Sequence, residues 1–344
     1  MSMETPNQTL KPVRWGVLGA GNFAQKVSLP GMKRGPLTEI VALASRDIAK
    51  AQAAAEALGI PRAYGSYEEL LADPEIEVVY NPLPNHMHVD WSARAARAGK
   101  HVLCEKPVAL DAADAETLIA VQRETGKLIC EAFMIRYHPQ WRQARDWVQS
   151  GRIGELLSVQ TAFCYFNRDA TNIRNRKDVG GGALYDIGCY CIQSARYAFG
   201  GLPTRVVGVI DRDPDFGTDR LTSALLDFPG GQAIFACSTQ LIPYQRVHFL
   251  GTKGRIEIEI PFNAPKDRPT RMFIDESGNI HGSGIVTEEF PTADQYTMQG
   301  DAFAKAVFEG GEVPVPLEDA IANMAVIEAI FKSADSNTWV KPEN

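Results

Sequence analysis

A regular alternation of short apolar runs and helical stretches in the first 132 residues constrains the fold of this chain more than any other feature. The apolar runs of strand length lie at 13–18, 40–44, 77–80, 101–104 and 128–132. Parallel strands need long crossover connections, and a helix usually supplies them. The alternation therefore predicts a doubly wound parallel sheet with crossover helices.

The first apolar run enters a glycine-rich turn, Gly19-Ala20-Gly21-Asn22-Phe23-Ala24, of the G-x-G-x-x-A type. The first glycine permits a tight turn, the second lets the backbone approach a pyrophosphate, and the small last residue lets helix and strand pack closely. Phosphates then lie at a helix N-terminus, where free N–H groups favour anions. With a strand before it and a helix after it, this turn predicts a Rossmann-type dinucleotide-binding domain over residues 1–132.

The end of the second strand bears on the choice of cofactor. An NAD site usually places an acid there for the ribose hydroxyls, but this chain has Ser45 and Arg46, with Lys50 one turn further on. A hydroxyl and two cations suit a 2′-phosphate better. Asp47 is the competing acid, and we interpret it as an N-cap because a good helical pattern follows it. We expect NADP as the cofactor, with NAD possible.

The stretch HVLCEKP at 101–107 places two charged residues, Glu105 and Lys106, at the end of a buried strand. Ligands bind outside the carboxyl ends of strands in an open parallel sheet, so Lys106 should face a crevice. A solvated strand end, closed by Pro107, is the alternative interpretation. Beyond the residues already given, we expect cofactor contacts from Leu83, Asn85, His88, Glu105 and Lys106.

After about residue 133 the alternation stops and a different pattern begins. Six strand-like runs lie at 154–166, 205–211, 221–228, 232–240, 246–250 and 254–260. Tight turns such as Pro229-Gly230-Gly231 and Thr252-Lys253-Gly254 join several of them. We therefore expect an antiparallel sheet within a second domain over residues 133–344, which binds substrate. Such a sheet needs helices or a second subunit to cover it, so we expect a homodimer.

A helical stretch in this second half carries candidate site residues. Asp186 and Tyr190 lie four residues apart and so share one helix face, and Gly180-Gly181-Gly182 before them permits close backbone approach. An amphipathic helix with a polar edge is the alternative. Arg168, Arg174, Asn175 and Arg176 lie on the preceding polar loop, where one or two should contact substrate. We expect Arg168 and Arg174 to do so.

Composition and charge exclude several classes of protein. The chain has 344 residues, 45% of them hydrophobic, and a net charge of −7 without any basic run, which argues against nucleic-acid binding. No apolar window is long enough to cross a bilayer, and the polar first dozen residues predict no secretory signal.

Six cysteines without a C-x-x-C pair indicate buried thiols in a reducing cytoplasm. His86 and His88 lack further ligands at a suitable spacing, so no metal site is expected.

The chain resembles the glucose-fructose oxidoreductase and inositol dehydrogenase superfamily, Gfo/Idh/MocA. The resemblance rests on GVLGAGNFA, YNPLPNHMHVDWSARAARAGKHVLCEKP, EAFMIRYHPQ and GGGALYDIGCYCIQSARYAFGG. The order and character of these blocks are most similar to the branch of glucose-fructose oxidoreductase, xylose dehydrogenase and dimeric dihydrodiol dehydrogenase. The resemblance implies an open-faced second sheet, and it implies that Lys106 and Tyr190 form the active-site pair. Inositol dehydrogenases carry a histidine where Tyr190 stands, which weakens an inositol assignment.

The chemistry implied by this pair is alcohol oxidation with nicotinamide as hydride acceptor. The proton of the alcohol needs a base, and a free tyrosine titrates at about 10, too high for neutral pH. Because a nearby ammonium favours tyrosinate, we expect Lys106 to lower the pKa of Tyr190. Tyr190 is then base in oxidation and acid in reduction, and Asp186 holds the substrate hydroxyl or Lys106. Lys106 as the proton acceptor is the competing assignment.

These inferences predict an NADP-linked oxidoreductase that acts on an aldose or a related vicinal diol. A trans-dihydrodiol dehydrogenase is the nearest alternative. Glycoside hydrolysis through transient oxidation with retained NAD is a second class, which Tyr190 in place of histidine disfavours. A non-catalytic NADP-sensing regulator is a third, and the intact lysine–tyrosine pair disfavours it.

Overall fold

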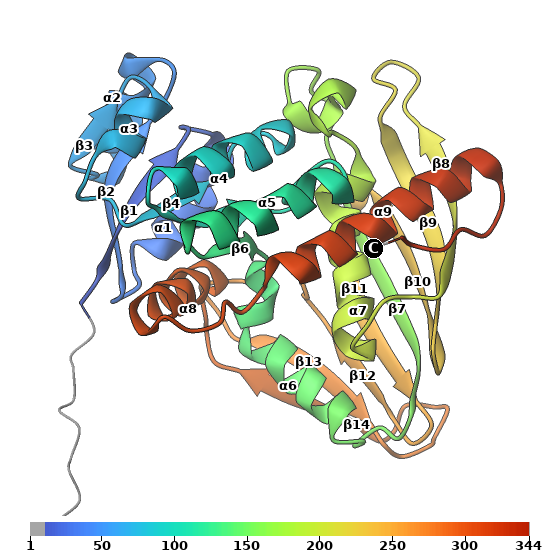
Figure 1. Ribbon diagram of the computed structural model, residues 1–344. Helices are drawn as coiled ribbons and strands as arrows, with labels where there is room; N and C mark the ends of the chain where they lie inside the picture. The colour runs from blue at the N-terminus through green and yellow to red at the C-terminus, as the bar shows by residue number, and fades with distance from the viewer. Residues whose placement is uncertain (1–10, 344) are drawn as a thin grey trace, which may run out of the picture.

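The structure, a computed structural model, describes residues 11–343 and contains two β-sheets with helices packed against them (Figure 1). The expectation that the polar first dozen residues form no secretory signal falls almost entirely outside the described residues.

The first sheet has six parallel strands in the order β3-β2-β1-β4-β5-β6. Its strands are β1 (Val13–Leu18), β2 (Thr38–Ala44), β3 (Arg62–Tyr64), β4 (Val78–Asn81), β5 (His101–Glu105) and β6 (Ile129–Ala132). The order reverses between β1 and β4, which places a crevice at their carboxyl ends. The predicted doubly wound sheet is confirmed. The sequence did not predict β3, because its three half-buried residues form no apolar run.

Helices connect these strands, and aspartates cap two of them. The helices are η1 (Ala24–Ser28), α1 (Leu29–Met32), α2 (Ile48–Leu58), α3 (Tyr67–Ala72), η2 (Asn85–Met87), α4 (His88–Arg97) and α5 (Ala112–Thr125). Asp47 accepts hydrogen bonds from the N–H groups of Ala49 and Lys50 at the start of α2. Such a cap satisfies N–H groups that the first helical turn leaves free. The interpretation of Asp47 as an N-cap is confirmed.

The second sheet has eight strands in the order β14-β13-β12-β11-β7-β10-β9-β8. They are β7 (Leu156–Phe166), β8 (Arg205–Arg212), β9 (Asp219–Phe228), β10 (Gly231–Ser238), β11 (Gln240–Gly251), β12 (Arg255–Ile258), β13 (Thr270–Asp275) and β14 (Ile285–Phe290). All neighbouring pairs are antiparallel except β7 and β10. The predicted sheet is confirmed, but β13 and β14 were missing from the prediction. They form one edge of the sheet, and β14 exposes five of its six residues, so its sequence lacks an apolar pattern.

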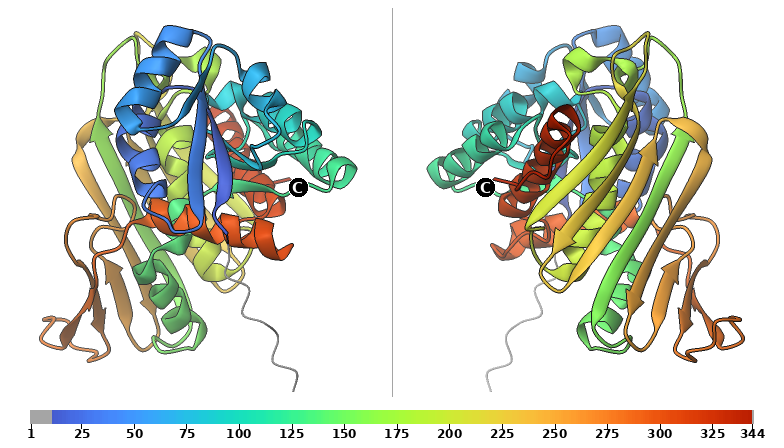
Figure 2. Two further views of the ribbon diagram at one scale, coloured as in Figure 1. Left: turned by 90° about the vertical axis from the view of Figure 1, so that its left-hand side faces the viewer. Right: turned by 90° about the vertical axis from the view of Figure 1, so that its right-hand side faces the viewer.

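Helices cover only one face of this large sheet, as both views of Figure 2 show. The helices of the second part are η3 (Met134–Tyr137), α6 (Pro139–Gln149), η4 (Ile173–Asn175), η5 (Lys177–Val179), η6 (Leu184–Gly188), α7 (Cys189–Phe199), α8 (Gln295–Glu309) and α9 (Leu317–Ser336). Helix α7 packs against β7 and β10, and α9 packs along β8. The opposite face leaves Val209 74% and Tyr244 50% exposed. This is the open face that the family resemblance implied.

The two C-terminal helices contact both halves of the molecule. Helix α8 packs against α1, and the ring of Phe303 meets the ring of Trp15 edge-on at 5.8 Å between centroids. Helix α9 packs against α5 as well as β8. The chain therefore returns to the first half after building the second sheet, and the predicted division at residues 132 and 133 stays a prediction.

Within residues 11–343, no helix combines the length and the apolar character that crossing a membrane requires. Over the same residues, no three His, Cys, Asp or Glu side chains gather as metal ligands would. All six cysteines are buried thiols, as their apolar surroundings in the sequence predict.

Candidate functional site

A cavity of about 670 Å³ runs from the glycine turn, past the ends of β2, β4 and β5, to the large sheet at β7. Its position matches the crevice predicted at the carboxyl ends of the parallel strands. The expected substrate-binding residues Arg174, Asp186 and Tyr190 line it, and Arg168 does not. The expected cofactor-binding residues that line it are Gly19, Ala20, Gly21, Asn22, Phe23, Ala24, Ser45, Arg46, Lys50, Leu83, Asn85, His88, Glu105 and Lys106.

The glycine turn has the backbone that a bound pyrophosphate needs. Gly19 has a φ of +93°, a value that side-chain-bearing residues rarely adopt. Its N–H donates to the carbonyl of Ala44 (2.8 Å), which ties the turn to the end of β2. A Cβ added at Gly21 would meet nothing within 4 Å, so open space lies beside this backbone. The turn therefore fits the phosphates of a dinucleotide.

The cavity end beside β2 carries cations and a hydroxyl. Ser45, Arg46 and Lys50 line it, whereas Asp47 does not. Among the described residues that line the cavity, the only carboxylates are Glu105 and Asp186, which lie at its other end. This donor set fits a 2′-phosphate better than a free ribose hydroxyl.

Lys106 stands at the end of β5 and reaches the second half of the molecule. Its Nζ donates to the carbonyl oxygen of Asp186 (2.6 Å) and to the Oδ1 of Asp186 (3.3 Å). Burial alone would lower the pKa of Lys106, but the Asp186 carboxylate raises it above its ordinary value. Lys106 is therefore held as an ammonium ion. The interpretation of a solvated strand end is wrong, because the Lys106 side chain is only 10% exposed.

The Asp186 carboxylate accepts hydrogen bonds from three side chains. Besides Lys106, the Nε of Arg174 donates to its Oδ2 at 2.9 Å, and the hydroxyl of Tyr165 donates to the same oxygen at 2.5 Å. Burial alone would raise the pKa of Asp186, but Arg174 and Lys106 together hold it well below its usual range. Asp186 is thus a buried anion that engages Lys106, one of the two roles expected for it.

Tyr165 is a cavity residue that sequence reasoning missed. It lies within β7, in a run predicted as a strand but not as part of the site. The one available signal was the two-residue period of a strand, which places Tyr165 on the same face as Phe163. Which functional group that face would meet depends on contacts distant in sequence.

Tyr190 lies in an aromatic wall, and the Lys106 ammonium meets its ring face rather than its hydroxyl. Its ring meets the rings of Phe133 and Phe163 edge-on, at 5.2 and 5.8 Å between centroids. The Nζ of Lys106 lies over the ring face, 4.9 Å from the centroid, and the Tyr190 hydroxyl donates to the Sδ of Met134 at 3.2 Å.

This wall corrects the expected effect on the pKa of Tyr190. Burial raises that pKa well above its ordinary value, so the predicted lowering by Lys106 is wrong for this arrangement. The physical reason is twofold: the ring is almost fully buried, and the Lys106 charge is already paired with Asp186.

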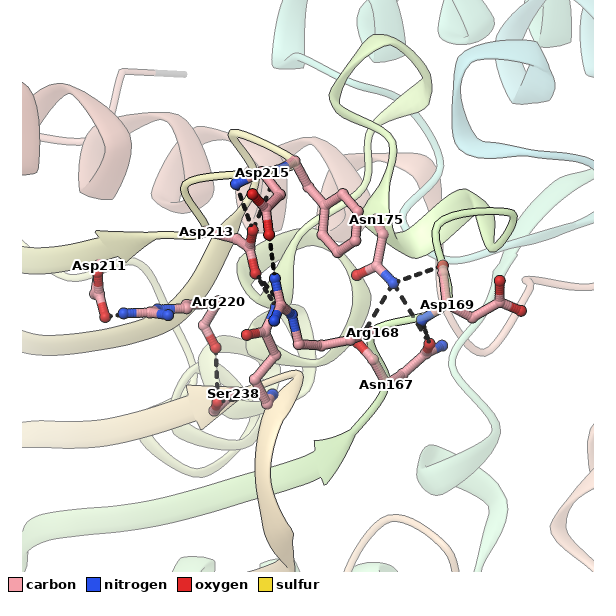
Figure 3. A network of polar contacts seen from close by, with 11 residues as sticks. Asn167, Arg168, Asp169, Asn175, Asp211, Asp213, Asp215, Arg220 and Ser238 are labelled. Carbon is pink, nitrogen blue, oxygen red and sulfur yellow. Dashed lines mark hydrogen bonds and ion pairs between the residues drawn. The ribbon is translucent and has the colours of Figure 1, made fainter.

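Arg168 binds away from the cavity, contrary to its expected substrate contact. Its Nη2 donates to Asp215 at 2.6 Å and its Nε lies 3.3 Å from Asp213 (Figure 3). In the same network the side-chain amide of Asn175 donates to the carbonyl of Asp169 at 2.9 Å. These contacts fasten the loop after β7 to the turn between β8 and β9. Of the four polar candidates on this loop, only Arg174 lines the cavity.

The start of the helix that carries Asp186 and Tyr190 is fixed by Asp219. The Oδ2 of Asp219 accepts a hydrogen bond from the N–H of Leu184 at 2.6 Å. Gly182 has a φ of +120°, and a Cβ there would lie 1.9 Å from the Oδ1 of Asp219. The close backbone approach predicted for the glycine triplet is therefore confirmed at Gly182.

His88 forms part of the cavity wall, but both of its ring nitrogens are engaged. Nδ1 lies 2.7 Å from the carbonyl oxygen of Pro107, and Nε2 lies 2.7 Å from that of Leu83. Burial lowers the pKa of His88 to about 4. The ring therefore joins the loop after β4 to the loop after β5, and its nitrogens are not free to bind a cofactor.

A dinucleotide-type cavity that ends in a lysine, an aspartate and a tyrosine defines a Rossmann-fold oxidoreductase. Comparison with known proteins identifies the family. Residues 13–133 match the model of an oxidoreductase family with an NAD-binding Rossmann fold, and residues 141–257 match the GFO/IDH/MocA C-terminal domain. The chain belongs to this family, as its sequence motifs predicted.

Two curated relatives and one solved structure illustrate the similarity. An uncharacterized oxidoreductase of Rhizobium meliloti is 47% identical, covering 95% of this chain and 98% of its own. The D-xylose 1-dehydrogenase (NADP(+)) 2 of Haloferax volcanii is 37% identical, covering 95% and 99%. A 3-ketoreductase of Actinomadura kijaniata, solved with NADP and TDP-benzene, has a TM-score of 0.87 and 34% identity, covering 94% and 98%.

Further structures of that ketoreductase carry single substitutions at a lysine or at a tyrosine. These two positions are as far apart in its chain as Lys106 and Tyr190 are in this one.

A buried carboxyl group behind Lys106 generates a pH prediction. Glu131 on β6 accepts a hydrogen bond at its Oε1 from the N–H of Val108 (2.9 Å). Its Oε2 is buried and has no partner among the described residues. Burial raises the pKa of Glu131 to about 8. The group is therefore largely neutral at pH 7 in the folded protein.

Between about pH 5 and pH 8 the folded protein holds a proton on Glu131 that the unfolded chain releases, so its stability should fall as the pH rises. We predict that Glu131→Gln removes this part of the fall, which is at most about 1.4 kcal/mol per pH unit. Urea unfolding at pH 5, 6.5 and 8 measures it, with the exposed Glu116→Gln as the control. Parallel pH profiles for the wild type and Glu131→Gln would contradict the prediction.

Proposed function

We propose that the protein is an NADP-dependent oxidoreductase that transfers a hydride between nicotinamide and a CH–OH group of an aldose or a related vicinal diol. The observation that carries this proposal is the meeting of Lys106, Asp186 and Tyr190 at one end of a cavity whose other end is a dinucleotide-binding turn. The NADP named for the Haloferax relative and for the ketoreductase structure supports the choice of cofactor.

The chain's own residues divide the work as follows. The turn from Gly19 to Ala24 holds the pyrophosphate, and Ser45, Arg46 and Lys50 hold the 2′-phosphate. When bound, NADP supplies or accepts the hydride. The cavity residues between Phe163 and Tyr190 surround the reacting sugar ring and exclude water from it.

Tyr190 is the proton donor in reduction and the acceptor in oxidation. Burial raises its pKa, so the phenol is protonated at neutral pH, which is the form that can donate a proton to a carbonyl oxygen. Oxidation instead requires the tyrosinate, and the Lys106 ammonium over the ring offsets only part of the cost that burial imposes on that charge.

Lys106 is a weak candidate for the proton acceptor itself, because Asp186 keeps it protonated. Its role in this proposal is to place a positive charge where the substrate oxygen becomes negative. Substituted lysine and tyrosine positions at the same separation in the ketoreductase support this pairing. A trans-dihydrodiol substrate would use the same groups, and a panel of aldoses, polyols and diols separates the two substrates.

We predict that Tyr190→Phe lowers kcat by at least about a hundredfold, because it removes the proton-transfer group. NADP binding, measured by fluorescence titration, should be retained. Tyr185→Phe is the matched control, since its hydroxyl donates to the carbonyl of Leu110 and does not line the cavity. Near-normal turnover by Tyr190→Phe would refute the role.

We predict that Arg46→Ala weakens NADP binding by about tenfold or more and leaves NAD binding unchanged, because only NADP offers a 2′-phosphate. The exposed Arg94→Ala, outside the cavity, is the control. Titration of both cofactors into each protein measures the effect. Tighter wild-type binding of NAD than of NADP would reject the assignment.

We also propose a homodimer that covers the open face of the large sheet. Light scattering should then give twice the 37.7 kDa of one chain. A charge in this apolar face, as in Val209→Arg, should shift the mass toward one chain because burying an unpaired charge is costly. A wild-type mass equal to that of one chain would contradict the proposal.

A further inference from the structure

A second hollow adjoins the candidate site at the end that holds Tyr165. It measures about 370 Å³ and shares Phe163, Tyr165 and Asn263 with the main cavity. We call it the annex, and its lining residues are Phe163, Cys164, Tyr165, Pro243, Tyr244, Gln245, Arg246 and Asn263. None of the catalytic roles proposed above uses it.

An irregularity in β11 opens the annex. Gln240 pairs with Phe166 and Tyr244 pairs with Cys164, so three residues of β11 stand opposite a single residue of β7. Extra residues in one strand bend it locally away from regular pairing. One of the three is Pro243, which cannot donate to a neighbouring strand and lines the annex.

The annex combines aromatic rings with amide groups that have no partner. Gln245 Oε1 accepts hydrogen bonds from the N–H groups of Phe262 (2.8 Å) and Asn263 (3.0 Å), which fixes this side chain in place. The NH₂ group of Gln245 has no partner among the described residues, and neither does the side-chain amide of Asn263. Phe163 and Tyr165 line the annex beside these amides, whereas the ring of Tyr244 belongs to the open face of the sheet. Aromatic faces for C–H groups and amides for hydroxyls match the chemistry of a sugar.

The charge of the annex argues for a neutral ligand. Arg246 is the one cation among the described residues that line it. Its Nε lies 3.1 Å from Glu257 Oε1, and its Nη1 donates to the carbonyls of Gln245 and Glu259. A phosphate or diphosphate group needs cations that are not already paired. The annex therefore suits a second sugar ring better than a nucleotide.

We propose that the annex is a second sugar subsite and that the substrate is a neutral disaccharide or glycoside. The reacting sugar ring lies at Tyr190, and the second ring lies against Phe163, Tyr165 and the amides of Gln245 and Asn263. This inference rests on the proposed function, because the place of the reacting ring follows from the role of Tyr190.

The test compares matched sugars on the full-length protein, read as NADPH absorbance. Xylobiose against xylose, and cellobiose against glucose, should give a kcat/KM at least about tenfold higher for the disaccharide. dTDP-glucose should show no such gain over glucose. Equal or lower kcat/KM for both disaccharides would overturn the subsite, and a gain confined to dTDP-glucose would assign the annex to a nucleotide instead.

Gln245→Glu keeps the side-chain oxygen that accepts from Phe262 and Asn263 and removes the NH₂ donor. It should reduce the disaccharide advantage to about twofold and leave kcat/KM for the monosaccharides within about twofold of wild type. Gln232→Glu is the matched control, because it makes the same change at an exposed strand residue outside both the annex and the main cavity. Light scattering on both variants shows whether the subunit assembly is intact. An equal loss for both sugar classes in Gln245→Glu would overturn the proposal.

Calorimetric titration separates failure of the subsite from failure of the proposed function. Turnover of monosaccharides without any advantage for disaccharides rejects only the subsite. Absence of NADP-linked turnover with every sugar rejects the proposed function. Tighter binding of cellobiose than of glucose, lost in Gln245→Glu, would still support the annex in that case.

Discussion

The Asp186 carboxylate is the contact on which the rest of the site depends. Its donors come from three separate parts of the chain. Lys106 lies at the end of β5, Tyr165 lies in β7, and Arg174 lies in the loop between β7 and η6. A buried carboxyl without partners would take up a proton, whereas this one stays charged because three donors surround it. Its charge in turn keeps Lys106 protonated. The two halves of the molecule are thus joined by a charge cluster whose members set one another's ionisation.

Polar contacts around the cavity set the geometry of that cluster. Asp219 fixes the start of η6, the helix that carries Asp186. Arg168 fastens the loop that carries Arg174, and His88 joins the loops after β4 and β5. Each of these side chains bonds to backbone or to a structural partner instead of facing a ligand. The precision of the site therefore depends on residues that touch no reacting atom.

The part of the site that could be predicted from the sequence is the part encoded locally. The glycine turn and the Lys106 strand end are recognisable because spacing within a few residues determines their backbone. The Asp47 cap is local in the same way. Tyr165 could not be found because its role depends on meeting Asp186 across the fold. The contacts of Arg168 and the pKa of Tyr190 were predicted wrongly for the same reason. The acidic turn between β8 and β9 decides the contacts of Arg168, and the aromatic wall decides the pKa of Tyr190.

Helix α9 has a consequence for how the cavity can change shape. It lies against α5 of the first half and β8 of the second (Figure 1), and much of its surface is buried between them. A hinge motion that swung the halves apart would have to pull this helix off one of its two neighbours and expose apolar surface to water. A wide opening of this kind therefore carries a free-energy cost that the packing of α9 sets. The last helix thus resists a change in the angle between the two halves of the molecule.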